Sequence, residues 1–153
     1  MLPKIRPMQQ SDIESVYEIE KSSHLAPWGE DILSDCVLVG YDCRVIELTV
    51  NNTEQIIGYI ICRYSFNVCH ILNLCVSTPY QGKGYGQLIL QSVLDSLKSN
   101  AAINTVILEV RPSNAAAMAL YKKFGFLQDS IKKGYYNDSH GLEDAILLKK
   151  LLS

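Results

Sequence analysis

The stretch Gln81-Gly82-Lys83-Gly84-Tyr85-Gly86 (QGKGYG) decides the fold of this 153-residue chain. It follows the apolar run 71–76 and precedes residues 88–97, where leucine, isoleucine and valine recur at helical spacing. Glycine costs about 1 kcal/mol inside a helix. Three glycines in six residues therefore suit a tight loop whose backbone approaches a ligand closely. The sequence predicts a strand, a glycine-rich loop and a helix in direct succession.

The glycine-rich loop is a candidate cradle for a pyrophosphate group. The first N–H groups of a helix lack partners inside the helix, and that helix end carries partial positive charge. Glycines just before it let an anion reach those donors, and Lys83 adds charge. The alternative is a structural turn with no ligand, and the glycine spacing alone does not choose between the two. The loop matches neither the P-loop nor the dinucleotide fingerprint.

Length and composition fit one domain spanning residues 1–153. The formal net charge is −2, which argues against nucleic-acid binding by bulk charge. No apolar stretch approaches the roughly 20 residues of a membrane span, and the first residues lack the apolar segment of a secretion signal. We therefore expect a cytoplasmic protein with no membrane and no direct nucleic-acid partner.

The five cysteines include no C-x-x-C pair and the three histidines are scattered, so we expect free thiols and no metal.

Hydrophobic spacing predicts an α/β layered domain. We expect strands at 4–8, 44–50, 56–64, 69–76, 105–110, 127–132 and 145–151, and helices at 11–20, 30–36, 88–97 and 114–124. Ser11 and Glu14 have the spacing of a capping box for the first helix. The order β-α-α-β-β-β-α-β-α-β-β indicates helices packed on a largely antiparallel sheet. The pairs Lys132-Lys133 and Lys149-Lys150 are expected to be solvated.

Two motifs resemble those of the GCN5-related N-acetyltransferases, the GNAT family, which bind acetyl-coenzyme A. One is the loop at Gln81, which fits Gln/Arg-x-x-Gly-x-Gly/Ala at the start of a helix. The other is 108–126, where a strand, Asn114, a helix, Tyr121 and Gly125-Phe126 follow in the family's order. The resemblance covers nearly the whole chain. It implies the GNAT fold, a mixed, mostly antiparallel sheet with helices on both faces and a splayed, bulged central strand pair.

A finer resemblance, to the RimI branch, rests on Ala26-Pro27-Trp28, Tyr135-Tyr136 and Glu143-Asp144-Ala145. That branch acetylates the N-terminal alanine of small-subunit ribosomal protein eighteen. The resemblance thus implies a ribosomal protein N-terminus as substrate, contacted by Trp28, Tyr135 and Tyr136, with no further partner needed for catalysis.

Two residues depart from the pattern. Gly82 stands where many relatives carry arginine, which removes one phosphate contact, and Ala26 stands where an aromatic residue often precedes Pro-Trp, which leaves the shape of the substrate mouth open.

Glu109 and Tyr121 are the candidate catalytic residues. Glu109 is the only acid in an apolar strand, and it is either the partner of Arg111, on the same face, or the base that takes a proton from the acceptor amine. Tyr121 shares a helix face with Asn114. It is either a core aromatic beside Phe124 or the acid that protonates the leaving thiolate. The family resemblance favours the base and the acid.

The resemblance also assigns the cofactor contacts. The backbone of the strand end is expected to meet the pantetheine arm as an added strand would, with an N–H near Cys75 or Val76 on the thioester carbonyl. Asn114 is expected to cap its helix and to touch the cofactor. A covalent acyl-cysteine on Cys75 is disfavoured because no histidine is identifiable as its base. The full expected set is Leu74, Cys75, Val76, Gln81, Gly82, Lys83, Gly84, Tyr85, Gly86, Gln87 and Asn114.

Two alternatives to this function stay open from the residues. One is an acetyltransferase of the same family acting on a small amine or on another protein's N-terminus. The other is a coenzyme A-binding regulatory domain without chemistry, against which the presence of both Glu109 and Tyr121 argues.

Overall fold

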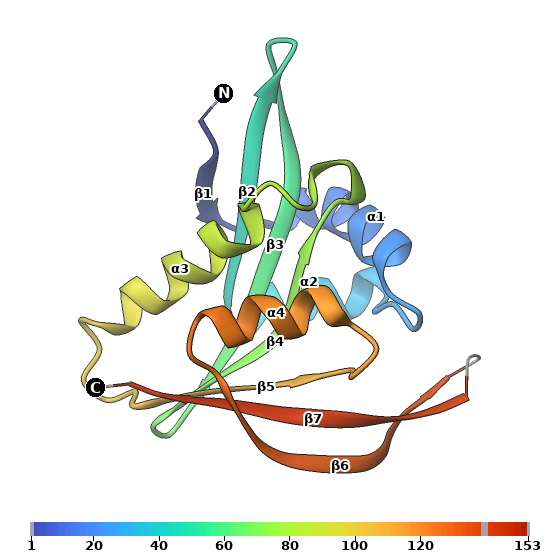
Figure 1. Ribbon diagram of the computed structural model, residues 1–153. Helices are drawn as coiled ribbons and strands as arrows, with labels where there is room; N and C mark the ends of the chain where they lie inside the picture. Colours follow the sequence, from blue (N-terminus) through green and yellow to red (C-terminus); the bar gives the residue numbers. More distant parts are fainter. Residues whose placement is uncertain (1, 139–140, 153) are drawn as a thin grey trace.

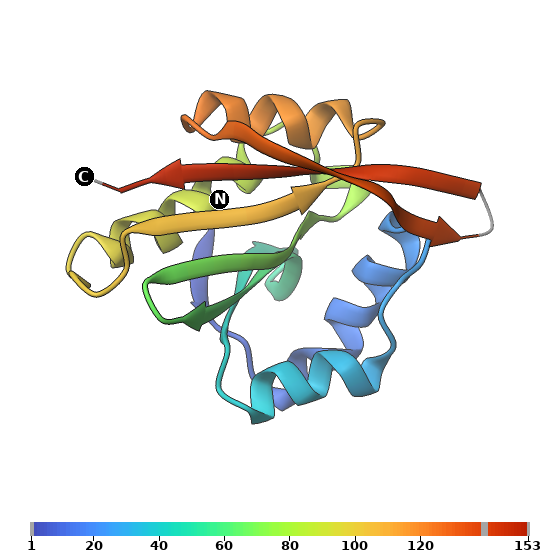
Figure 2. The same ribbon diagram turned by 90° about the horizontal axis from the view of Figure 1, so that it is seen from below.

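Seven strands form one sheet in the order β1-β2-β3-β4-β5-β7-β6 in the computed structural model, which describes residues 2–138 and 141–152 (Figure 1). Helices cover both faces of the sheet (Figure 2). The strands are β1 (Lys4–Pro7), β2 (Asp42–Val50), β3 (Thr53–Ser65), β4 (Val68–Val76), β5 (Thr105–Val110), β6 (Leu127–Asp138) and β7 (Gly141–Leu151). The helices are α1 (Ile13–Ser23), α2 (Glu30–Leu38), α3 (Tyr85–Leu97) and α4 (Ala115–Lys123), with short 3-10 turns at Gln10–Asp12 and Thr78–Tyr80.

The central strand pair is bulged and splayed. The register of β3 and β4 shifts between Ile61 and Cys62, so that β4 carries one extra residue there. β4 pairs in parallel with β5 only over 68–70, and the other strand pairs of the sheet are antiparallel. Beyond these residues the two strands diverge (Figure 1). The expected mixed sheet with a splayed, bulged pair is confirmed.

The last two strands are longer than the sequence predicted. β6 continues past Lys132 to Asp138, and β7 begins at Gly141 rather than at Ala145. The register between them is irregular from Lys132 to Tyr136, and Gly134 there has a positive φ of 59°. An exposed strand interrupted by a glycine lacks a clear period-two pattern, which is why the expected strand ended early.

The predicted capping box at the start of α1 is wrong. Ser11 lies inside the 3-10 turn, and the acid that closes this turn is Asp12, whose carboxylate accepts the backbone N–H of Gln9 at 2.7 Å. The same carboxylate accepts two hydrogen bonds from Arg6, at 2.8 and 2.9 Å. The ion pair from β1 therefore fixes where α1 begins.

Two hydrophobic cores hold the sheet between the helices. On one face Ile89, Leu90 and Val93 of α3 are fully buried with residues of β3, β4 and β5. On the other face Val16 of α1 and Leu33 of α2 are fully buried against β2 and β3. A fully buried side chain of this size contributes about 2 kcal/mol. Both cores touch β4, so the strand that borders the site is held from both sides.

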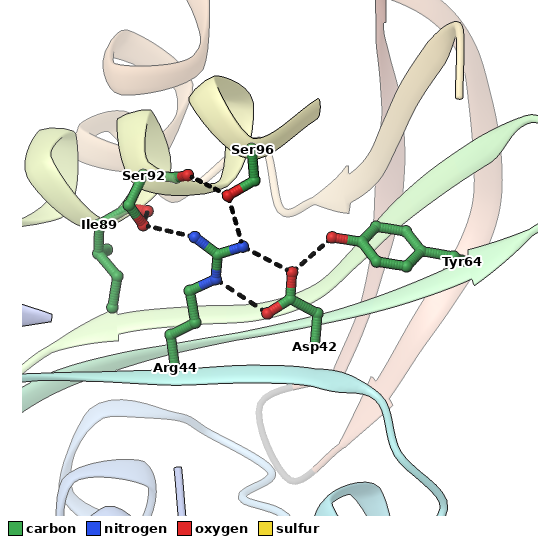
Figure 3. Close-up of polar contacts among 6 residues, drawn as sticks. All are labelled: Asp42, Arg44, Tyr64, Ile89, Ser92 and Ser96. Atoms are coloured by element: carbon green, nitrogen blue, oxygen red, sulfur yellow. Dashed lines mark hydrogen bonds and ion pairs between the residues drawn. The ribbon is translucent and has the colours of Figure 1, made fainter. Parts of the chain in front are cut away.

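A polar cluster fastens α3 to the sheet (Figure 3). Arg44 of β2 donates to both carboxylate oxygens of Asp42 at 2.9 Å and to the hydroxyls of Ser92 and Ser96 at 3.2 and 3.0 Å. Tyr64 of β3 donates to Asp42 at 2.5 Å. Burial raises the pKa of Asp42, but the hydrogen bonds from Arg44 and Tyr64 outweigh it and hold the pKa below its usual value. The cluster fixes the helix whose first turn borders the site.

Candidate active site

A cleft of about 530 Å³ opens where β4 and β5 separate. Its walls come from the end of α1, the end of β4, the glycine-rich loop and α4. A larger groove of about 990 Å³ lies between the C-terminal ends of α3 and α4, but of the predicted site residues it holds only Gln87. The smaller cleft is therefore the candidate site. It is lined by Ser23, His24, Leu25, Leu74, Cys75, Val76, Tyr80, Gln81, Gly82, Gly84, Tyr85, Gly86, Arg111, Ser113, Asn114, Ala116, Ala117, Leu120 and Tyr121.

The glycine-rich loop presents free backbone donors to this cleft. Gly82 and Gly84 have positive φ values of 75° and 89°, and a Cβ on either would meet no protein atom within 4 Å. The first hydrogen bond within α3 runs from Leu88 N–H to Gly84, and no side chain caps the helix. The N–H groups of 85–87 thus have no partner inside the helix, as an anion site requires. The loop therefore fits a pyrophosphate.

Side chains in and beside the loop attach it to neighbouring elements. Gln81 donates from Nε2 to the carbonyl of Val76 at 2.8 Å, which fastens the loop to the end of β4. Gln87 accepts a hydrogen bond from Lys123 of α4 at 3.0 Å. The ammonium of Lys83 lies 6.0 Å from the ring centre of Tyr80. Lys83 is exposed and is adjacent in sequence to the free donors.

Asn114 caps α4, as its position predicted. Its side-chain oxygen accepts the backbone N–H of Ala117 at 3.1 Å. The residue also lines the cleft, so α4, like α3, begins at the candidate site.

The end of β4 offers an unpaired strand edge. Leu74, Cys75 and Val76 pair with β3 on one side, whereas the pairing with β5 on the other side stops at His70. A free edge of this kind can bind an extended ligand through main-chain hydrogen bonds. Burial raises the pKa of the Cys75 thiol, which disfavours a thiolate nucleophile. The site thus fits a pantetheine arm better than an acyl-cysteine.

Tyr121 both lines the cleft and packs in the core. It is 6% exposed, and its ring meets Phe126 edge to face at 5.5 Å. Phe124, the expected neighbour, is the C-cap residue of α4 and packs against the same core as Tyr121. Burial raises the pKa of Tyr121, so its hydroxyl keeps its proton. A protonated phenol at a cleft wall is suited to donate to a leaving group.

Glu109 is held by two side chains, His70 and Lys132. Its carboxylate contacts Nε2 of His70 at 2.7 Å and the Lys132 ammonium at 3.0 Å, and its side chain is 13% exposed. The hydrogen bond from His70, followed by that from Lys132, outweighs burial and lowers the pKa of Glu109 to about 2. The alternative pairing with Arg111 is wrong, and so is the expectation that Lys132 is merely solvated. Glu109 does not line the 530 Å³ cleft.

Arg111 instead ties the β6–β7 ribbon to the start of α4. Its guanidinium donates to Asp138 at 2.5 Å and to Glu143 at 3.2 Å, and it lies 4.1 Å from the ring centre of Tyr136. Glu143 also accepts the backbone N–H of Ser113 at 2.9 Å. The two strands that carry the predicted substrate contacts are therefore fixed relative to the cleft wall.

The three predicted substrate residues lie outside the cleft wall. Tyr135 and Tyr136 meet edge to face at 5.0 Å on β6, and Tyr135 is 52% exposed. Trp28 lies in the connection between α1 and α2, where it packs against the core on that face. Both views bring this connection close to the free end of the β6–β7 pair (Figures 1 and 2).

The sequence prediction missed a buried polar group at the end of α1. Glu20 is 2% exposed, and its carboxylate accepts from Tyr59 at 2.5 Å, from Asn73 at 2.7 Å and from the N–H of Trp28 at 2.9 Å. Nε2 of His24 lies 3.3 Å from it. The signal was present: Glu20 continues the helical apolar spacing of Ile13, Val16 and Ile19, where a carboxylate must find partners.

Metal and membrane features are both absent from the described part of the chain. Among residues 2–138 and 141–152 no three His, Cys, Asp or Glu side chains are grouped to hold a metal ion. None of the helices in these ranges is long and apolar enough to cross a membrane.

Comparison with known proteins identifies the class. Residues 13–126 match the Acetyltransferase (GNAT) family, and the chain belongs to that family. It is 35% identical over 145 residues to the ribosomal protein bS18-alanine N-acetyltransferase of Haemophilus influenzae, covering 94% of this chain and 95% of that one.

Solved structures agree with this assignment. The crystal structure of the ribosomal-protein-S18-alanine N-acetyltransferase from Escherichia coli matches with a TM-score of 0.88 at 30% identity, over 99% of this chain and 95% of that one. Arabidopsis thaliana NAA60 in complex with acetyl-CoA matches with a TM-score of 0.86 over 98% of both chains. At 19% identity the latter shows the fold alone. The chain is an acetyl-CoA-dependent acetyltransferase with the GNAT fold.

Proposed function

We propose that this protein is a single-domain cytoplasmic enzyme that moves the acetyl group of acetyl-CoA to the α-amine of an N-terminal alanine, that of ribosomal protein bS18. The observation that carries the proposal is the cleft between β4 and β5, with the free N–H groups of the α3 N-terminus at its mouth. Two relatives, at 35% and 30% identity, are named ribosomal protein bS18-alanine N-acetyltransferases. No partner chain is needed for the transfer.

The cofactor is assigned along the cleft in three parts. The N–H groups of 82–87 hold the pyrophosphate, with Lys83 and Gln81 beside it. The edge of β4 at 74–76 holds the pantetheine arm and presents an N–H to the thioester oxygen. Asn114 and Tyr121 face the same cleft from α4. When bound, acetyl-CoA supplies the activated acyl group.

Tyr121 is proposed as the acid for the leaving sulfur. A free thiol has a pKa of about 8.5 and a phenol about 10, so full proton transfer from phenol to thiolate is uphill by roughly 2 kcal/mol. A hydrogen bond that strengthens in the transition state requires no full transfer. The buried hydroxyl of Tyr121 is kept protonated and can make this bond.

Glu109 is proposed to act on the acceptor side. A carboxylate with a pKa of about 2 is a weak base toward an α-ammonium with a pKa near 8, because the gap of about six units corresponds to roughly 8 kcal/mol. To act as a base, Glu109 must first lose its contact with Lys132. An incoming α-ammonium would then take the place of the Lys132 ammonium. As an anion it holds that α-ammonium without taking its proton. Glu109→Gln lowers the rate in both roles, but the loss shrinks at high pH only if Glu109 is the base.

The acceptor is an α-amine and not a lysine. An α-amine has a pKa near 8 and is partly neutral at pH 7, whereas lysine must shed about three pKa units, or roughly 4 kcal/mol. The cleft wall offers no carboxylate to help it: among the described residues that line the cleft there is no aspartate or glutamate.

The test uses a pair of peptides carrying the first six residues of the ribosomal protein. One has a free N-terminus, and the other is blocked there and bears an added lysine. Mass spectrometry with acetyl-CoA should show acetylation of the free peptide alone. If the blocked peptide is acetylated as fast, N-terminal transfer is wrong. If neither is modified while a small amine is, the substrate class is wrong and the family assignment stands.

A further inference from the structure

Glu109 lies where β4 and β5 begin to separate. The two strands pair in parallel over 68–70 and 105–107, and Glu109 follows this pairing by two residues. Its neighbours Leu108 and Val110 are buried in the core that contains α3. Successive side chains of a strand point to opposite faces of the sheet. Glu109 therefore faces the side of the sheet that carries α1 and α2.

His70 reaches Glu109 across the start of this gap. Its neighbours Cys69 and Ile71 are buried in the same core as Leu108, so His70 also faces the side of α1 and α2. Nε2 of His70 lies 2.7 Å from Oε2 of Glu109, and the two side chains are only 16% and 13% exposed. The contact thus joins the last paired residue of β4 to a residue of β5 that lies beyond the pairing.

The two partners of His70 determine which ring nitrogen carries the proton. Nη2 of Arg63 lies 3.3 Å from Nδ1, and a guanidinium only donates hydrogen bonds. Nδ1 therefore accepts, and the ring proton is on Nε2. The carboxylate of Glu109 is ionised, because the hydrogen bonds from His70 and Lys132 outweigh burial and lower its pKa to about 2. A neutral imidazole in one fixed tautomer thus donates to Glu109.

The two oxygens of Glu109 have partners of different kinds. Oε2 accepts from the largely buried ring of His70. Oε1 accepts from the ammonium of Lys132 at 3.0 Å, and the Lys132 side chain is 44% exposed. The pairing of β6 with β7 becomes irregular at Lys132. An acceptor ammonium matches the Lys132 ammonium in charge and in donors, so the exchange takes place at Oε1 and leaves the donor at Oε2 in place.

We infer that His70 is a positioning residue for the transfer, which holds Oε2 of Glu109 so that Oε1 stays turned toward the acceptor amine. The inference rests on the acceptor-side role proposed for Glu109 and deepens it. Rotation of a carboxylate about its last bond displaces both oxygens, and a displacement of about 1 Å at a reacting group lowers a rate about a hundredfold. A donor fixed at one oxygen prevents this rotation and leaves the other oxygen open.

Loss of the His70 donor has two opposing effects on Glu109. The carboxylate becomes free to rotate, which lowers the rate. It also becomes more basic, because a hydrogen bond to the charged form lowers a pKa, and a stronger base would raise the rate. A net loss of rate in a variant without the donor therefore reports on the position of the carboxylate and not on its basicity.

The experiment measures kcat and KM for the acceptor peptide and for acetyl-CoA in wild type, His70→Phe and the matched control His70→Gln. Phenylalanine keeps a ring but has no donor, whereas glutamine keeps an N–H near the place of Nε2. His70→Phe should lower kcat/KM for the peptide about tenfold or more, with the KM for acetyl-CoA within about twofold of wild type. His70→Gln should stay within about threefold of wild type in both constants.

A double-mutant cycle with Glu109→Gln shows whether His70 acts through the carboxylate. In the Glu109→Gln background, His70→Phe should change kcat/KM by less than about twofold, because the group that it positions is already gone. Equal losses in both backgrounds, a His70→Phe rate within about twofold of wild type, or no recovery in His70→Gln overturn the inference. If His70→Phe does not fold by circular dichroism, His70→Leu takes its place with the same criteria.

The outcome is separable from that of the proposed function. A wild type that ignores peptide N-termini contradicts the proposed substrate, and the cycle is then run with the amine that is accepted. A Glu109→Gln variant as fast as wild type contradicts the proposed role of Glu109 and overturns the inference with it. A slow Glu109→Gln beside a fast His70→Phe overturns the inference alone.

Discussion

At the residue scale, the pairing of charges depended on strands that are distant in sequence. Glu109 and Arg111 do lie two positions apart on or beside β5, as the sequence indicated. Their partners, however, are His70 of β4 and Lys132 of β6 for the acid, and acids of the β6–β7 ribbon for the arginine. Side chains two apart on a strand lie nearly 7 Å apart, whereas cross-strand neighbours lie closer. No local sequence pattern shows which of these neighbours a charged side chain will pair with.

Glu109 makes the stability of the protein depend on pH in the acid range. Its pKa is lowered from 4.5 to about 2 by folding, so the unfolded chain binds a proton first. The stabilisation is full above pH 4.5 and is lost as the pH falls toward 2, and it amounts to at most about 3 kcal/mol. Urea unfolding from pH 6 to pH 2.5 should therefore show the stability gap between wild type and Glu109→Gln closing as the pH falls.

A second variant tests whether the contacts of Glu109 cause this pH dependence. Lys132→Met removes only the second of the two hydrogen bonds to Glu109, so its pH dependence should fall between those of wild type and Glu109→Gln. Parallel stability curves for all three proteins would show that the ion pairs do not set the acid stability.

At the element scale, the sequence placed every helix and strand but not their ends. The strand, the glycine-rich loop and the helix follow one another in the predicted order, because apolar periodicity and glycine clustering are local signals. The start of α1 and the length of β6 were missed because they depend on Arg6 and on the pairing of two exposed strands. A tertiary contact decides where such an element begins or ends.

The glycine-rich loop allows a matched test of the cofactor cradle. Gly84 and Gly40 have φ values of 89° and 84°, and a Cβ on either meets no atom within 4 Å. Valine at either position therefore costs a similar backbone strain, about 2 kcal/mol. Only Gly84→Val places a branched side chain beside the free N–H groups of α3. Calorimetry should show acetyl-CoA affinity reduced at least tenfold in Gly84→Val and unchanged in Gly40→Val.

The result is decided by the difference between the two variants. Equal affinity of both for acetyl-CoA, with both folded, would rule out the loop as the pyrophosphate site.

The attachment of α3 to the sheet depends on Arg44 (Figure 3). Arg44→Met leaves Asp42 without its cation and breaks the two hydrogen bonds that tie Ser92 and Ser96 of α3 to the sheet. Breaking one side of a partly buried pair costs more than the pair contributes, so we expect a loss of about 2 kcal/mol in the free energy of unfolding.

Lys98→Met is the matched control for Arg44→Met. It breaks an exposed pair with Asp95 on the same helix and should change stability by less than about 0.5 kcal/mol. Denaturant unfolding that gave equal losses for both variants would show that the cluster does not hold the helix.

At the scale of the whole molecule, the fold class followed from the sequence while half of the candidate site did not. The donor side is continuous in sequence, 74–87 with Asn114 and Tyr121, and its motifs could be recognised. A buried polar cluster near the end of α1 is assembled from α1, β3 and β4, and its residues Glu20, Tyr59 and Asn73 meet only after folding. None of these residues carries a recognisable sequence signal on its own. The partners of such a buried carboxylate therefore emerge only from the structure.

Acetyl-CoA should stabilise the whole protein because its cleft joins α1, β4, α3 and α4 where β4 and β5 separate. A ligand that binds only the folded state at one hundred times its Kd adds about 2.7 kcal/mol, which raises the Tm of a protein of this size by about 7 °C. Thermal melts should show this shift with acetyl-CoA and a much smaller one with acetylated pantetheine at the same concentration, since that fragment lacks the pyrophosphate that we assign to the α3 N-terminus. In Gly84→Val the two ligands should become alike. Equal shifts from both ligands in the wild type would mean that the glycine-rich loop contributes nothing to the binding of the cofactor.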